Sequence, residues 1–180
     1  MHDFVPKAYL DVHGVDPQIF DIANGMTDFA ETGDWHGALA TACGVVSRYW
    51  RVRDAIEGER VVQTALASLL YVGHGPYIVR HEQESGGGFV DIAFEPQLNR
   101  WPQIGHAALV ELKYLRQQDD ASSAALAQIR AAARAQIDRY AADHDLVRAW
   151  NLRERDGTAT LHRIVLVFHG GDVALCEEVA

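Results

Sequence analysis

Residues 86–114 read GGGFVDIAFEPQLNRWPQIGHAALVELKY, and two apolar runs in this stretch carry charged residues. The runs 89–96 and 107–114 are rich in aliphatic and aromatic residues and are separated by a polar loop, which predicts two β-strands. Side chains alternate between the two faces of a strand. We therefore expect Glu111 and Lys113 to point to the same face of the second strand.

Charges inside apolar runs need a partner, because burying an unpaired charge is costly. Asp91 lies in the first run, and Glu111 and Lys113 lie in the second. Carboxylate oxygens are the ligands that Mg²⁺ prefers, and a bound cation activates water against a phosphodiester. Glu59, at the start of a preceding helix, would add a third carboxylate. The alternative is that Glu111 and Lys113 form an ordinary pair on a half-exposed sheet.

The composition excludes several classes of protein. A chain of 180 residues with 48% hydrophobic content is expected to form one compact domain. Its net charge of −9 argues against a generic basic nucleic-acid binder, although cations could neutralise a local site. Cysteines and histidines lack metal-ligand spacing, and no signal peptide or membrane span is visible. We therefore expect a cytoplasmic protein without a zinc site.

The rest of the chain predicts helices around these strands. The expected elements, in order, are helices within 1–58, a helix over 59–72, strands over 77–82, 89–96 and 107–114, a helix over 121–143, a strand over 161–170 and a short closing strand. The three glycines at 86–88 lead into a strand and lack a following Gly-Lys-Ser/Thr, so they predict a hairpin turn and no phosphate loop. Sequential strands followed by a crossover helix indicate an α/β fold.

The order of these residues resembles the PD-(D/E)XK, or restriction-endonuclease-like, nuclease superfamily. The most similar branch usually follows an ATPase-like domain in bacterial proteins. The matching positions are Glu59 and Gln63 in the first core helix, Gly88, Asp91 and Glu95-Pro96 in the second strand, Glu111 to Tyr114 in the third strand, and Gln136 and Tyr140 in the long helix. Val90 stands where the superfamily often has proline. The ATPase-like domain is absent, so the chain is read as a fragment or a stand-alone version.

The resemblance implies a fold and a domain organisation. The fold would be a restriction-endonuclease-like αβββαβ core over 59–180, with a central mixed sheet flanked by helices. Residues 1–58 would be a helical lead-in packed on this core, so that the chain is a single domain overall. It also implies Mg²⁺- or Mn²⁺-dependent hydrolysis of phosphodiester bonds, with DNA favoured over RNA as the substrate.

The resemblance also assigns roles to residues. The metal ligands would be Asp91, Glu111, the Leu112 carbonyl and Glu59, and the catalytic residues would be these three acids together with Lys113. Gln63, Gln136 and Tyr140 would line the site or contact the substrate. Two alternatives stay open, namely a catalytically inactive binding or regulatory module of the same fold, and a nuclease toxin domain. A protein partner would then be an ATPase-like domain or an immunity protein.

Overall fold

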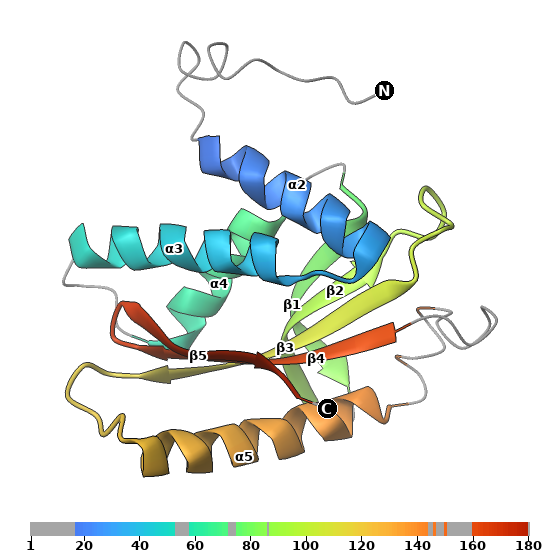
Figure 1. Cartoon of the computed structure of the whole chain (residues 1–180). Helices are drawn as coiled ribbons and strands as arrows, with labels where there is room; N and C mark the ends of the chain where they lie inside the picture. The colour runs from blue at the N-terminus through green and yellow to red at the C-terminus, as the bar shows by residue number, and fades with distance from the viewer. Residues whose placement is uncertain are drawn as a thin grey trace.

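The computed structural model describes residues 17–52, 58–71, 75–85, 87–143, 146, 150 and 160–179. The elements in chain order are α2 (Pro17–Thr32), α3 (His36–Val52), α4 (Glu59–Leu70), β1 (Tyr77–Ser85), β2 (Gly88–Pro96), β3 (His106–Leu115), α5 (Ser123–Ala141), β4 (Thr160–His169) and β5 (Asp172–Glu178), as Figure 1 shows. Each strand expected from the sequence is present. None of the described helices is long and apolar enough to cross a bilayer.

The strands form one mixed sheet of five strands in the order β1-β2-β3-β4-β5. Strands β1, β2 and β3 make an antiparallel meander, and β5 pairs antiparallel with β4. Strands β3 and β4 are parallel along their whole length, from His106–Thr160 to Leu115–His169. A parallel pair requires a crossover connection, which α5 provides. The predicted α/β fold with a central mixed sheet is confirmed.

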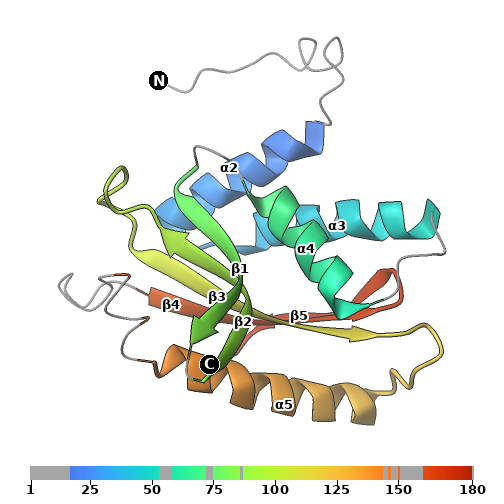
Figure 2. The same cartoon turned by 180° about the vertical axis from the view of Figure 1, so that it is seen from behind.

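Helices cover both faces of the sheet. Helices α2, α3 and α4 lie on one face and α5 lies on the other (Figures 1 and 2). Two clusters of buried apolar side chains correspond to these two layers, one containing Phe29, Leu66 and Leu112 and the other containing Leu109 and Ile137. Because both faces are covered, the central strands β3 and β4 carry nearly continuous apolar sequence.

The two core helices form because their apolar residues recur at helical spacing. In α4 the buried side chains are Val62, Gln63, Leu66, Ala67 and Leu70. In α5 they are Ala133, Ile137 and Tyr140, and Ser122 caps the helix by accepting a hydrogen bond from the Ala125 N–H at 3.3 Å. Spacings of three and four residues place each set on one side of its helix. The buried side of α4 also carries Gln63, a polar residue that points toward the sheet.

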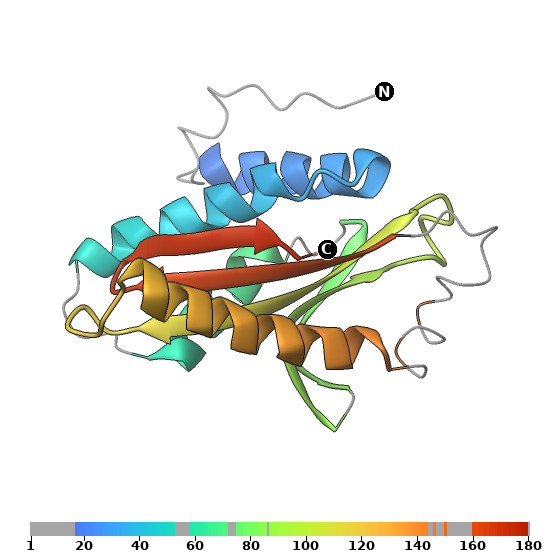
Figure 3. The ribbon, with the colours of Figure 1, turned by 60° about the horizontal axis from the view of Figure 1, so that its bottom comes forward.

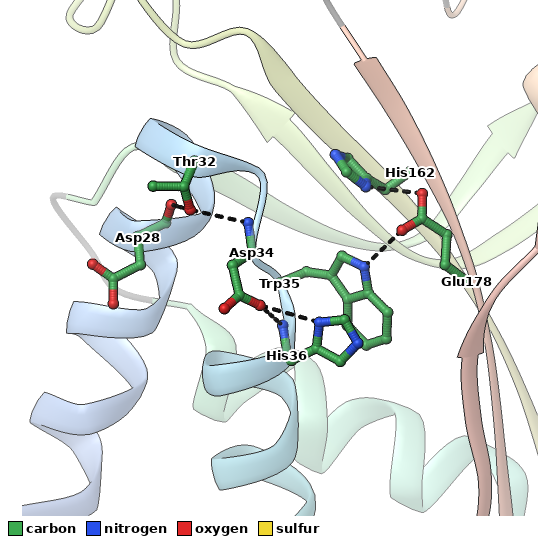
Figure 4. A network of polar contacts seen from close by, with 7 residues as sticks. All are labelled: Asp28, Thr32, Asp34, Trp35, His36, His162 and Glu178. Carbon is green, nitrogen blue, oxygen red and sulfur yellow. Dashed lines mark hydrogen bonds and ion pairs between the residues drawn. The ribbon is translucent and has the colours of Figure 1, made fainter.

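A polar network joins the α2–α3 connection to strands β3, β4 and β5. Figure 4 shows its members Trp35, His162 and Glu178. Trp35 Nε1 donates to Glu178 Oε2 at 3.0 Å, and Glu178 Oε1 lies 2.9 Å from His162 Nδ1. His162 Nε2 in turn lies 3.1 Å from His106 Nδ1. Burial, and then the neighbouring His162, lower the pKa of His106. The sequence shows none of these contacts, because the four residues are far apart in the chain.

Substituting Glu178 with alanine should destabilise the protein by about 1–3 kcal/mol, because the buried Trp35 N–H and His162 lose their acceptor. Urea denaturation of the variant would measure this loss. The matched control is Glu177→Ala, which removes a partly exposed ion pair with Arg130 and should cost less than about 1 kcal/mol. Equal losses in the two variants would show that the network adds nothing beyond a surface ion pair.

Candidate functional site

Strands β2 and β3 separate in the middle of the sheet. Their ladder contains the pairs Ile92–Val110, Ala93–Leu109 and Phe94–Ala108, whereas β1 follows β2 as far as the Ser85–Gly88 pair. In Figure 3 the β1–β2 hairpin extends away from the rest of the sheet. Beyond Val110, the edge of β3 that faces β2 must therefore satisfy its backbone N–H groups without a neighbouring strand.

Two carboxylates take the place of the missing strand. Asp91 Oδ2 accepts from the Leu112 N–H at 2.7 Å, and Glu59 Oε2 accepts from the Tyr114 N–H at 3.3 Å. In an antiparallel edge a residue turns its N–H and its C=O to the same side. The Leu112 carbonyl therefore faces the same gap as the two carboxylates. Glu59 reaches this gap from the first turn of α4, and Asp91 reaches it from β2.

Glu111 and Lys113 lie on the sheet face that α5 covers. Val110 and Leu112 belong to the opposite core layer, so the predicted alternation is confirmed. Lys113 Nζ lies 2.6 Å from Glu111 Oε1, and the Glu111 side chain is fully buried. Among the described residues, Glu111 Oε2 is buried without a hydrogen-bond partner. An ordinary exposed pair is thus excluded as the explanation of these two residues, because one oxygen of the buried carboxylate has no hydrogen-bond partner.

The site concentrates negative charge away from water. Burial raises the pKa of Asp91 to about 6, and the nearby Glu59 and Glu82 add to this effect. Burial, followed by the charge of Asp91, raises the pKa of Glu111 to about 7. Burial opposes the charge of Lys113, but its hydrogen bond to Glu111 and the surrounding acids outweigh burial and raise its pKa. A lysine held in its charged form thus faces acids that are costly to ionise.

Gln63 and Glu82 constrain the backbone around Asp91. Gln63 Nε2 donates to the Asp91 carbonyl at 2.8 Å, which fixes β2 against α4. The β1–β2 ladder passes from His81–Ile92 to Gln83–Val90, so Glu82 lies opposite Asp91 where pairing is interrupted. Glu82 has a φ of 53°, in the left-handed region that residues other than glycine rarely adopt. This local strain lies directly beside the acid that the sequence singles out.

A cavity of about 360 Å³ opens beside Asp91. The residues that line it are Glu59, Arg60, Gln63, Glu82, Phe89 and Asp91. Glu82 also pairs with Arg60 at 3.1 Å. Reasoning from the sequence missed Arg60, Glu82 and Phe89. The hairpin register could have identified Glu82, since a turn at the glycine triplet sets it opposite Asp91.

Gln136 and Tyr140 lie on α5, below the start of β2. Gln136 Nε2 donates to the Tyr140 hydroxyl at 2.8 Å, and Tyr140 is buried in the core layer of α5. A Cβ at Gly88 would meet the Tyr140 hydroxyl at 2.8 Å, so glycine is needed for the ring to approach the strand. The pair thus supports the hairpin three residues before Asp91. A contact of either side chain with substrate stays a prediction.

The donor atoms suit a hard divalent cation. Mg²⁺ commonly takes one or two carboxylates and keeps several waters, so it does not need a complete protein cage. Within the described ranges, no three Asp, Glu, His or Cys side chains converge into such a cage. The unpartnered Glu111 Oε2, the carboxylate of Asp91 and the carbonyl of Leu112 are all oxygen donors facing an excess of negative charge. These residues therefore fit Mg²⁺ or Mn²⁺ better than they fit a softer metal.

The chain matches the family model of the PD-(D/E)XK nuclease superfamily over residues 57–178. The matched region runs from α4 through β5 and includes Glu59, Asp91, Glu111 and Lys113. Proteins of this superfamily typically use divalent metals. No curated protein and no solved structure matches the chain.

Replacing Asp91 with asparagine should stabilise the metal-free protein at pH 8 by on the order of 1 kcal/mol. The folded-state pKa of Asp91 is raised from 3.8 to about 6, so its favourable contribution is present below pH 3.8 and is lost as the pH rises through 6. Asparagine keeps an acceptor for the Leu112 N–H and removes the charge. Urea denaturation in EDTA at pH 8 and at pH 3.5 would measure the difference.

The stabilisation by Asp91→Asn should shrink at pH 3.5, where the wild-type carboxyl is protonated in the folded protein. The matched control is Asp138→Asn, since Asp138 pairs with Arg163 at 2.6 Å and its loss should not stabilise the protein at either pH. A destabilised Asp91→Asn variant at pH 8 would contradict the view that this carboxylate is held at a cost to stability.

Proposed function

Because this chain belongs to the PD-(D/E)XK nuclease superfamily, we propose that it is a Mg²⁺- or Mn²⁺-dependent nuclease that hydrolyses phosphodiester bonds in DNA. The observation that carries this proposal is the meeting of Asp91 and Glu59 on the open edge of β3, beside the buried Glu111. We further propose that 59–180 form the nuclease core and that 1–58 form a lead-in packed on it.

Four groups would hold the cation, namely the carboxylates of Asp91, Glu111 and Glu59 and the carbonyl of Leu112. A bound divalent cation stabilises charge on the phosphate and lowers the pKa of a coordinated water. One oxygen of Asp91 accepts a hydrogen bond from the Leu112 N–H, and one oxygen of Glu111 accepts one from Lys113. The other oxygen of each carboxylate would then bind the cation.

Lys113 would act on the phosphate. Its raised pKa keeps the ammonium charged at neutral pH, and its contact with Glu111 holds it at the site. A fixed positive charge there would stabilise the negative charge that develops on the phosphate oxygens during attack. Lys113 is one of two lysines in a chain with 16 lysines and arginines in total. Arginine would be a poor replacement, because its planar guanidinium differs in shape from a compact ammonium.

The remaining predicted residues would position these groups. Gln63 holds the backbone of Asp91 against α4. Gln136 and Tyr140 support the start of β2 from the other face. Their substitution should therefore alter the geometry of the site more than its chemistry.

Purified protein with Mg²⁺ or Mn²⁺ should cleave DNA, and Asp91→Asn, Glu111→Gln and Lys113→Met should each lower the rate by on the order of 10²-fold or more. Lys113→Arg should not restore the rate. Gel analysis of labelled DNA with and without EDTA would measure cleavage. The control is Glu177→Gln, an acid on β5 that pairs with Arg130 and should leave the rate unchanged.

Calorimetric titration with Mn²⁺ would test the same site without relying on activity. The wild-type protein should bind the cation, and Asp91→Asn and Glu111→Gln should weaken binding, because each removes a charged oxygen donor. Binding should also weaken below pH 6, where both raised pKa values leave the acids protonated. Unchanged cleavage and unchanged Mn²⁺ affinity in both variants would overturn the proposed site.

A further inference from the structure

Phe89 exposes an aromatic ring at the cavity beside Asp91. The residue is 59% exposed, whereas the other large apolar residues of β2 (Ile92 and Phe94) are buried. Phe89 lies two residues before Asp91 and lines the same cavity. What distinguishes Phe89 from the other exposed apolar residues of the described chain, such as Tyr71, is that it lines the cavity beside Asp91.

The ring lies on the part of β2 that has left β3. Phe89 pairs with Glu84 across the hairpin, beyond the last β2–β3 pair at Ile92. The hairpin extends away from the sheet there, as Figure 3 shows. A nucleic-acid strand that enters the gap beside Asp91 would therefore pass the ring. An aromatic face next to a reacting centre can hold a flat, uncharged group in a fixed position.

The charges around the ring favour a nucleobase over a phosphate as its ligand. Three acids line the cavity (Glu59, Glu82 and Asp91), and its one arginine, Arg60, already pairs with Glu82. The whole chain carries a net charge of −9. Phosphate contacts alone would thus give weak binding. Stacking of a base on an aromatic ring supplies affinity without any positive charge, and it requires that the base be unpaired.

We propose that Phe89 stacks on an unpaired base next to the phosphate that is cleaved, so that the site selects single-stranded DNA over duplex DNA. This inference rests on the proposed nuclease function and adds its substrate class. A base inside a duplex presents only its edges, because its faces are covered by neighbouring bases. A duplex would therefore have to unpair before it could use the ring.

Binding of fluorescein-labelled oligonucleotides, measured by anisotropy with Mg²⁺ in a Lys113→Met background that does not cleave, tests the proposal. Phe89→Ala should weaken binding of a single strand about tenfold and change binding of a blunt duplex of the same sequence less than about twofold. Phe89→Trp should restore single-strand binding. The matched control is Tyr71→Ala, because Tyr71 is also 59% exposed but lies at the end of α4 and does not line the cavity.

The proposal would be overturned if the protein bound the single strand and the duplex with equal affinity. It would also be overturned if Phe89→Ala weakened binding of the single strand and of the duplex by the same factor. A different result would show that only the nuclease proposal is wrong. In that case single-strand binding would still depend on Phe89, but the wild-type protein would cleave no DNA. If the wild-type protein cleaves DNA, Phe89→Ala should lower kcat/KM on single strands relative to duplex. An unchanged ratio would reject the role of Phe89 and leave the nuclease function standing.

Discussion

The structure depends on the separation of β2 from β3 beyond the Ile92–Val110 pair. An open sheet edge inside a protein must find new partners for its N–H groups. Here the partners are carboxylates, since Asp91 accepts a hydrogen bond from the Leu112 N–H and Glu59 accepts one from the Tyr114 N–H. The same hydrogen bonds that complete the edge therefore bring acids from a strand and a helix to one place.

The arrangement has an electrostatic cost that the rest of the fold offsets. Glu111 is buried among acids, and its pKa rises to about 7, because the interior hydrates its charge poorly. Lys113 compensates part of this charge from the same face of β3. The core layers on both sides of the sheet hold these groups in place. An excess of buried carboxylates over positive charges is what one expects at a site that binds a cation and a phosphate.

The scaffold keeps this site rigid by fixing the strands from both sides. Helix α4 is attached to β2 through Gln63 and to β3 through Glu59. On the opposite face, Tyr140 packs so closely on Gly88 that a Cβ there would force the tyrosine ring to move. The hairpin that carries Asp91 is thus held between two helices, while Phe89 beyond it remains exposed.

The sequence by itself determined the elements and their order, and it singled out the main residues of the candidate site. Alternation along β3 separates Glu111 and Lys113 from Leu112, and helical spacing gives α4 and α5 their buried sides, because these are local periodicities. Only the tertiary structure decided that Glu82 lies opposite Asp91, that Phe89 lines the cavity, and that His106, His162, Glu178 and Trp35 form one network. Such contacts depend on where strands diverge and how layers pack. They join residues that are far apart in the sequence, so no local periodicity predicts them.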